Sequence, residues 1–367
     1  MTSVSELRSY TYYRGRVALY VLLKALGIDQ GDEVITQAFT CVAVPEGIMA
    51  AGAKPVFVDI ETSGFNMDTA DLERKITFKT RAIIVQHTYG IPADMDSIVQ
   101  VAERHRVRII EDCCHTLAST FKGKTVGTFG VASFYSFEWG KPIVVGIGGS
   151  ALINDVALYE KLESQYVHFR YPPLVKIIRI QLQYAGFKFI YRPSLYWPVR
   201  GLFHLLGKIG AAESNYNSVK QDEIARDFHL RMPKSLQKRL VHELIDLDAQ
   251  VRHSRWVTAE YESRIKSSAI SHPVLPKNTE TVFARYPLVV DDKYILLKEA
   301  RKANIELADW YLTPVHPLDM TDCEIVNYKA GSCPVAEERC NQVVTLPTHI
   351  AVKKRDIDRS VRFLNRG

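Results

Sequence analysis

The chain has 367 residues, 47% of them hydrophobic and 24% charged, which is typical of a soluble globular protein with one large domain and a smaller one. The net charge of +6 is too small to indicate a nucleic-acid-binding protein, so we expect no nucleic-acid partner. The six cysteines show no disulfide or metal-ligand spacing, and the first residues do not resemble an export signal. We therefore expect no metal and a cytoplasmic location.

Helical and extended segments alternate from residue 16 to about residue 155. We expect helices at 16–26, 42–51, 71–76 and 95–105, and strands at 33–36, 55–59, 81–85 and 107–110. The strand at 81–85 shows little alternation of apolar and polar residues, as is usual for a strand that is covered on both faces. The alternation predicts an α/β fold with a doubly wound, mostly parallel sheet, whose active site lies at the carboxyl ends of the strands.

The C-terminal part of the chain is organised differently. A long helix is expected at about 235–265, and the short strands and helices that follow it predict a second, smaller α/β domain. We therefore divide the chain into a large domain (1–240) and a small C-terminal domain (241–367).

Residues 165–215 interrupt the alternation with aliphatic, aromatic and basic residues. Seven basic residues and no acidic one lie between residues 164 and 212, so this window carries +7 and the rest of the chain about −1. One interpretation is a lid or a weak contact with an anionic membrane surface. We favour a buried inter-domain or dimer segment, because prolines cut the segment into short pieces. These are Pro172, Pro173, Pro193 and Pro198.

Two residues indicate the chemistry. Lys141 lies between a short apolar segment (133–137) and a glycine-rich segment (146–149), where a lysine can serve as a Schiff-base amine. Asp112 ends the apolar segment 107–112, and a carboxylate there can hold the protonated pyridine nitrogen of pyridoxal phosphate. Together they predict pyridoxal 5′-phosphate as the cofactor.

Eight segments resemble, in family order, the DegT/DnrJ/StrS sugar aminotransferases, which are pyridoxal-phosphate enzymes of fold type I. The resemblance covers nearly the whole chain. The segments are 31–35, 52–59, 87–96, 110–115, 135–141, 148–149, 333–338 and 346–349. Each is weak by itself, whereas eight in order are highly specific.

The resemblance implies a role for most of the matched positions. Lys141 would form the Schiff base and transfer protons, Asp112 would bind the pyridinium nitrogen, and His115 would contact the oxygen on the ring. The remaining cofactor-binding candidates are Gly15 and Arg16 at the start of the first helix, the hydroxyl residues Ser136 and Thr40, and Cys41 beside the ring. His87 and His316 lie in segments that line the substrate cleft of relatives, and a structural role is an equal alternative for both.

Three residues depart from the family pattern. Cys41 stands where many relatives have an aromatic residue that stacks on the ring, and Ile147 replaces a common glutamate. His229 stands where many relatives have an asparagine that reaches the phosphate of the partner subunit. Some family members have histidine in place of the lysine and catalyse dehydration, so Lys141 favours transamination.

The resemblance implies transfer of an amino group from L-glutamate to a keto sugar, which we expect to be linked to a nucleotide, by a ping-pong mechanism. It also implies a homodimer with shared active sites, in amino-sugar, lipopolysaccharide, capsule or antibiotic biosynthesis. The alternatives are transfer to a free cyclitol or keto polyol, cofactor-dependent dehydration, and a non-catalytic regulator on the same scaffold. Retention of both Lys141 and Asp112 argues against the regulator.

Overall fold

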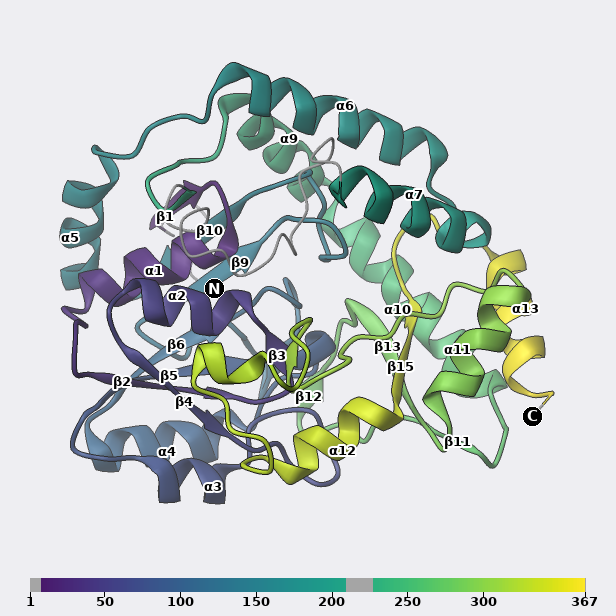
Figure 1. The fold of residues 1–367 in the computed structure, drawn as a ribbon, viewed down its shortest axis with the longest axis horizontal. Coiled ribbons are helices and arrows are strands. Elements are labelled where there is room, and N and C mark those ends of the chain that lie inside the picture. The colour runs from purple at the N-terminus through teal and green to yellow at the C-terminus, as the bar shows by residue number, and fades with distance from the viewer. Residues whose placement is uncertain (1–7, 209–226, 367) are drawn as a thin grey trace.

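The computed structural model describes residues 8–208 and 227–366, so residues 209–215 of the insert lie outside the described part. A seven-stranded sheet forms the core of the larger part, with the strand order β4-β2-β5-β6-β9-β10-β1 (Figure 1). Its strands are β1 (Arg8–Tyr12), β2 (Glu33–Gln37), β4 (Lys54–Val58), β5 (Thr80–Gln86), β6 (Arg108–Asp112), β9 (Ala132–Ser136) and β10 (Gly149–Ile153). Strands β4, β2, β5, β6 and β9 run parallel to one another. Strand β10 pairs antiparallel with β9, and β1 pairs antiparallel with β10. The predicted α/β fold with a mostly parallel sheet is confirmed.

Helices cover both faces of this sheet. Helices α1 (Gly15–Ala25), α2 (Ala43–Ala50) and α5 (Val156–Tyr166) lie on one face, and α3 (Thr69–Lys75) and α4 (Met95–His105) on the other. Alternate residues of β5 enter the two cores: Ala82 and Ile84 pack on the α1 side, and Ile83 and Val85 on the α4 side. Burial of both faces explains the uninterrupted apolar run at residues 82–85 of β5.

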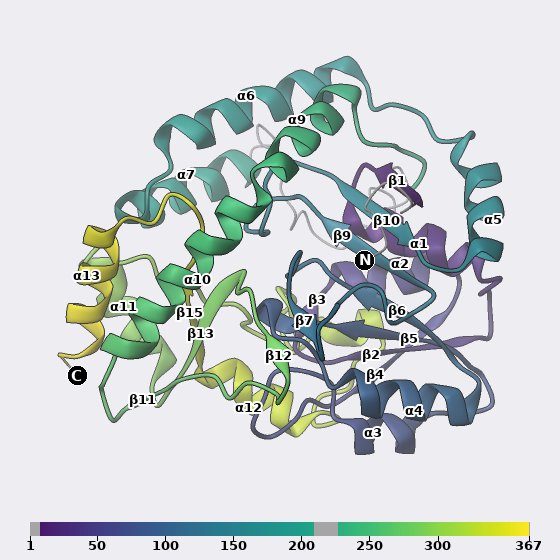
Figure 2. The ribbon, with the colours of Figure 1, turned by 180° about the vertical axis from the view of Figure 1, so that it is seen from behind.

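A three-stranded antiparallel sheet forms the centre of the C-terminal part, and helices pack around it (Figure 2). Its strands are β11 (Ile270–Ser271), β13 (Arg285–Val290) and β15 (Val343–Pro347), and the helices are α10 (Leu247–Arg264), α11 (Lys293–Lys302), α12 (Pro334–Gln342) and α13 (Lys354–Leu364). Two small sheets pair β3 (Thr40–Cys41) with β14 (Val315–His316), and β7 (Thr120–Phe121) with β8 (Lys124–Thr125) and β12 (Thr279–Glu280).

The helix expected at 235–265 consists of two helices. Helix α9 (Lys234–Ile245) is separated from the start of α10 by a single residue, Asp246. The domain boundary that we expect at residue 240 falls inside α9.

The insert forms longer helices than its prolines suggest. Helix α6 (Leu174–Ile190) is continuous over 17 residues and is followed by the 3-10 turn η3 (Pro193–Leu195) and helix α7 (Tyr196–Lys208). Our expectation of short pieces is therefore wrong for residues 174–190. Pro173 directly precedes α6 and Pro193 follows it, so neither removes a hydrogen bond from the helix interior. Within the described part of the chain, no helix has the length and apolarity needed to cross a bilayer.

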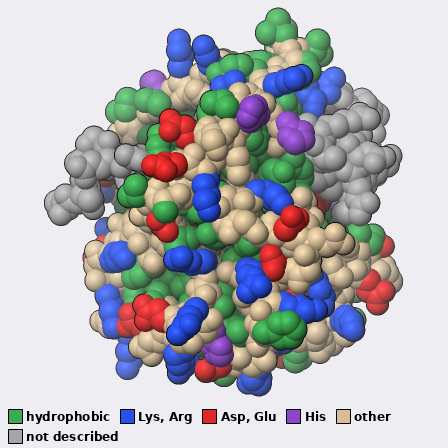
Figure 3. All heavy atoms as spheres, turned by 90° about the vertical axis from the view of Figure 1, so that its left-hand side faces the viewer, with side chains coloured by type: hydrophobic (Ala, Val, Ile, Leu, Met, Phe, Trp, Pro, Cys, Tyr) green, Lys and Arg blue, Asp and Glu red, His purple; other side chains and the backbone are tan. Residues whose placement is uncertain are grey.

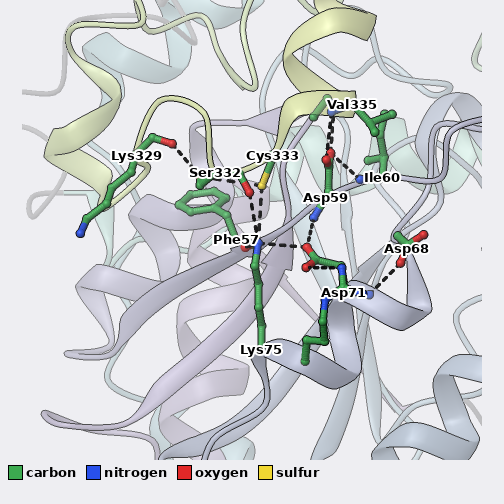
Figure 4. Close-up of polar contacts among 12 residues, drawn as sticks. Phe57, Asp59, Ile60, Asp68, Asp71, Lys75, Lys329, Ser332, Cys333 and Val335 are labelled. Carbon is green, nitrogen blue, oxygen red and sulfur yellow. Dashed lines mark hydrogen bonds and ion pairs between the residues drawn. The ribbon is translucent and has the colours of Figure 1, made fainter.

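One carboxylate joins the C-terminal part to the large sheet (Figure 4). Asp59 follows β4, and its two carboxylate oxygens accept hydrogen bonds from the N–H groups of Val335 (2.9 Å) and Ala336 (2.8 Å) in the first turn of α12. The N-cap residue of α12, Cys333, makes no side-chain capping bond. Asp59 therefore caps the helix from 276 residues away in the sequence.

Replacing Asp59 with alanine is expected to lower the free energy of unfolding by about 1–2 kcal/mol, because two N–H groups at the start of α12 lose their acceptor. Urea denaturation followed by circular dichroism measures this change. The matched control is Asp291→Ala at an exposed aspartate, for which we expect no significant change. Equal stabilities of the two variants would show that Asp59 does not hold α12.

Candidate active site

A pocket opens at the carboxyl ends of strands β5, β6 and β9. Of the predicted site residues, all except Thr40 and His87 line it. Its lining consists of Gly15, Arg16, Cys41, Ala43, Val44, Gln86, Asp112, Cys114, His115, Phe134, Ser136, Glu138, Trp139, Lys141, Trp310, Tyr311 and His316. The sequence-based expectation that the site lies at this edge of the sheet agrees with the position of the pocket.

Lys141 lies in the loop that follows β9. Its N–H donates to the carbonyl of Glu138 (3.3 Å), and the Phe137 N–H donates to the carbonyl of Gly148 (2.9 Å) on the returning strand. The side-chain nitrogen Nζ lies 5.3 Å from the ring centroid of Trp310, which comes from the C-terminal part. The loop thus places the lysine where the two parts of the chain meet.

Asp112 and Glu111 are neighbours in β6 and play different roles, because successive side chains of a strand point to opposite faces. Asp112 lines the pocket, and its Oδ1 accepts a hydrogen bond from the Cys114 N–H (2.9 Å). Burial raises the pKa of Asp112, and the positive charge of Lys141 opposes this rise only in part. A cationic group in the pocket would therefore stabilise the ionised carboxylate.

Glu111 is fully buried and holds the loop that precedes β9. Its oxygens accept hydrogen bonds from the N–H groups of Gly127 (2.6 Å), Phe129 (2.6 Å) and Gly130 (2.8 Å). Burial raises its pKa, but the hydrogen bonds from His87 and the backbone outweigh burial and leave the pKa of Glu111 below its usual value. Glu111 is therefore a structural anion.

His87 belongs to this structural network and does not line the pocket. Its Nδ1 accepts a hydrogen bond from the Ala93 N–H (3.1 Å), so its Nε2 is the donor to Glu111 (3.1 Å). Thr40 is also buried outside the lining, where its hydroxyl donates to the side chain of Gln86 (2.7 Å). The structure thus favours the structural alternative for His87 and places Thr40 behind Gln86, which lines the pocket itself.

The start of helix α1 forms another side of the pocket. The N-cap residue of this helix, Arg14, makes no side-chain capping bond, and no acidic residue occupies the first turn. A Cβ atom on residue 15 would lie 3.0 Å from the Cβ of Ser136, so glycine allows the helix to approach the end of β9. Arg16 forms an ion pair with Glu46. Helix N–H groups, a hydroxyl and a guanidinium are an arrangement that suits a phosphate.

An aromatic wall closes the pocket. The His115 ring stacks with Trp310 (5.5 Å between centroids) and Tyr311 (6.1 Å). Burial lowers the pKa of His115, and burial also lowers the pKa of His316 to about 4, so both imidazoles are neutral near pH 7. Cys41 lies in this pocket as well, and burial raises the pKa of its thiol.

Nine lining residues are not among the predicted site residues: Ala43, Val44, Gln86, Cys114, Phe134, Glu138, Trp139, Trp310 and Tyr311. Glu138 and Trp139 lie within three residues of Lys141, so proximity in sequence was an available signal. Trp310 and Tyr311 come from a segment about 170 residues further along the chain, and its only signal was the nearby predicted residue His316.

A second, larger cavity of about 420 Å³ adjoins the first. Lys141 and Trp310 line both cavities. The insert forms one wall of the second cavity through Tyr184, Phe187, Lys188, Tyr191, Arg192 and Tyr196, and the C-terminal part forms the opposite wall. The lysine therefore faces a space large enough for a substrate.

The charged and polar groups of the pocket fit pyridoxal phosphate. The buried carboxylate of Asp112, whose pKa is raised, suits a protonated ring nitrogen, and the uncapped start of α1 beside Ser136 suits a phosphate. Lys141 lines the same pocket and is the amine that the cofactor's aldehyde requires.

Comparison with known proteins gives concordant results. The chain is 44% identical over 160 residues to GDP-perosamine synthase of Escherichia coli O157:H7, a match that covers 44% of this chain and 43% of that enzyme. It is 31% identical over 344 residues to the pleiotropic regulatory protein of Geobacillus stearothermophilus, covering 93% of this chain and 79% of that protein.

Solved structures show the same fold. DesV of S. venezuelae superimposes with a TM-score of 0.76 at 24% identity, covering 98% of this chain and 84% of that one. The sequence profile of the DegT/DnrJ/EryC1/StrS aminotransferase family matches residues 9–365, which is nearly the whole chain. The protein therefore belongs to the DegT/DnrJ/EryC1/StrS aminotransferase family.

Proposed function

We propose that this protein is a pyridoxal-phosphate-dependent aminotransferase that moves an amino group from L-glutamate to a nucleotide-linked keto sugar. The observation that carries the proposal is that Lys141 and Asp112 line one pocket and that Lys141 also faces the adjoining cavity. A cofactor held in the pocket and a sugar held in the cavity would then meet at the lysine.

Each pocket residue has a definite task in this proposal. Pyridoxal phosphate, when bound, supplies an aldehyde that takes up an amine and a ring that accepts electrons when the substrate carbon loses a proton. Asp112 would remain ionised and hold the protonated ring nitrogen, the start of α1 and Ser136 would hold the phosphate, and the Lys141 amine would move the proton at the substrate carbon. Neutral His115 and the aromatic wall keep water away from this proton transfer.

The second cavity is the proposed acceptor site. Its insert wall is aromatic: Phe187 packs against Trp139 (5.0 Å between centroids) and stacks with Tyr191 (4.7 Å). Aromatic faces bind nucleobases and the apolar faces of sugars. Lys188 and Arg192 on the same wall can bind phosphate groups.

Replacing Phe187 with alanine is expected to raise the KM for the keto-sugar acceptor about tenfold, because one aromatic surface of the acceptor site is lost. The rate of the half-reaction with L-glutamate should not change, since Phe187 lines only the larger cavity. Stopped-flow measurement of each half-reaction separates the two effects. Equal slowing of both half-reactions would contradict an acceptor role.

The first experiment is an absorption spectrum of the purified protein with pyridoxal phosphate, before and after addition of L-glutamate, followed by a panel of nucleotide-linked keto sugars, free cyclitols and keto polyols. The proposal expects the cofactor band to be lost with glutamate and restored with a nucleotide-linked keto sugar, and the amino sugar to be detected by mass spectrometry. Restoration by unlinked polyols alone would contradict the nucleotide requirement. Loss of a hydroxyl without amine incorporation would identify a dehydratase.

A regulatory protein on the same scaffold is the second candidate, because a relative that matches 93% of the chain is named a pleiotropic regulatory protein. In that case the spectrum would not respond to L-glutamate. A cofactor band that responds to the amino donor excludes this candidate.

We also propose a homodimer with shared active sites, which the family resemblance implies. His229 would be the residue closest to the partner's phosphate, in place of the usual asparagine. Size-exclusion chromatography with light scattering measures the oligomeric state, and a monomer at micromolar concentration would contradict the proposal.

A further inference from the structure

Helix α6 has one face that packs on the protein and one that is exposed. Its inner face carries Ile180, which is buried, and Tyr184 and Phe187, which contact Trp139. Its outer face carries five exposed apolar side chains, which we call the outer stripe. These are Leu174, Val175, Ile178, Leu182 and Phe189, each between 52% and 80% exposed.

The outer stripe follows the helical repeat. Leu174, Ile178 and Leu182 are spaced by four residues, and Phe189 lies seven residues further on, so at about 100° per residue the stripe covers an arc of about 100°. Exposed apolar residues that occur singly need no explanation, whereas a continuous stripe along a helix indicates a binding surface.

Basic residues lie on both sides of the outer stripe. On the helical wheel, Arg179 lies about 40° beyond one edge of the stripe and Lys188 about 40° beyond the other. Lys188 pairs with Glu243 (3.4 Å) at the inner side, and Arg192 follows the helix in an exposed position. The insert contributes no acidic side chain between residues 164 and 212. At the top of Figure 3, the end of the molecule where α6 lies, hydrophobic side chains protrude beside lysines and arginines.

We propose that the outer stripe of α6 binds the surface of an anionic lipid bilayer, with the helix lying in the plane of the interface. The apolar residues would enter the boundary between headgroups and acyl chains, and the flanking cations would contact anionic headgroups. A continuous 17-residue helix whose outer stripe lies within an arc of about 100° meets the geometric requirement for such binding.

A second copy of the chain fits this surface less well. A two-fold interface brings the same patch of both subunits together. The cations that flank the stripe would then face the same cations of the other copy, and no acidic residue lies between residues 164 and 212 to separate them. An anionic bilayer complements both the apolar stripe and its charge. The proposal does not depend on the aminotransferase activity.

Vesicle sedimentation of the full-length protein tests the proposal. We expect binding to vesicles that contain about 30% phosphatidylglycerol in phosphatidylcholine. Binding to pure phosphatidylcholine should be much weaker, because basic residues contribute binding free energy only at an anionic surface. Raising the salt from about 50 mM to about 500 mM should weaken the binding. Arg179→Gln should lower the partition coefficient on anionic vesicles about fivefold.

The double variant Leu182→Ser, Phe189→Ser should lower binding at least about tenfold, because two inserted apolar side chains are lost. Phe78→Ser is the matched control: Phe78 is 86% exposed and lies outside the insert, and binding should not change. Circular dichroism verifies that each variant is folded. Absence of binding to anionic vesicles at low salt, or binding that the double variant retains, would overturn the proposal. A wild-type dimer that the double variant converts to a monomer would assign the stripe to self-association instead.

Discussion

The Lys141→Ala variant is expected to lose at least about 10⁴-fold in the rate of amino transfer, because the amine that takes up the cofactor and moves the substrate proton is removed. The loss should appear in the half-reaction with L-glutamate as well as in the overall reaction. Among the described residues, Lys141 is the one lysine that lines both cavities. No second amine is therefore placed to take over its role.

Reductive trapping gives a readout that does not depend on activity. After treatment with borohydride in the presence of pyridoxal phosphate, peptide mass spectrometry of the wild type should find the cofactor on Lys141, and the variant should carry no adduct in the pocket. Lys161→Ala, at an exposed lysine of α5, is the control and should behave as the wild type does. An adduct on another lysine in the wild type would refute the role of Lys141.

The Asp112→Asn variant is expected to lose about 10²–10³-fold in the same rate, because a neutral amide cannot hold a positive charge on the ring nitrogen. The variant keeps the size of the side chain and an oxygen that can accept the Cys114 N–H bond, so the fold should be retained. Steady-state kinetics and the absorption spectrum of the bound cofactor measure the effect.

Glu111→Gln gives the contrasting result. Glu111 accepts hydrogen bonds from three backbone N–H groups and from His87. Glu111→Gln should therefore lower the free energy of unfolding more than Asp112→Asn does. Asp112→Asn should lower activity with little change in stability. If Asp112→Asn instead unfolded the protein and left the specific activity of the folded fraction unchanged, Asp112 would be structural.

The sheet and its active edge could be predicted because the determinants are local. The apolar run of β5 shows a strand that is covered on both faces, and the carboxylate that ends β6 marks the edge where the pocket lies. Strand alternation places Glu111 and Asp112 on opposite faces, but the structural role of Glu111 is seen only in its contacts with His87 and the loop before β9.

The remaining features depend on contacts between distant segments. Trp310 and Tyr311 reach His115 across nearly 200 residues, and no local pattern predicts which loop of the C-terminal part meets the pocket. In the insert, proline content suggested short pieces, but the prolines lie at helix ends and in a first turn, where they are tolerated. Their positions, rather than their number, decide the length of α6.

The C-terminal part of the protein is fastened to the rest at several places, two of which lie far apart. Asp59 holds the start of α12 at one end of the molecule. At the other end, two side chains of the insert bind the C-terminal part: Trp197 donates a hydrogen bond to the carbonyl of Ile305, and Arg200 donates one to the carboxylate of Asp309. A rigid-body rotation that loosened one fastening would strain the other. Sugars should therefore enter and leave by local loosening of loops, and the shape of the acceptor cavity is set during folding, before any sugar arrives.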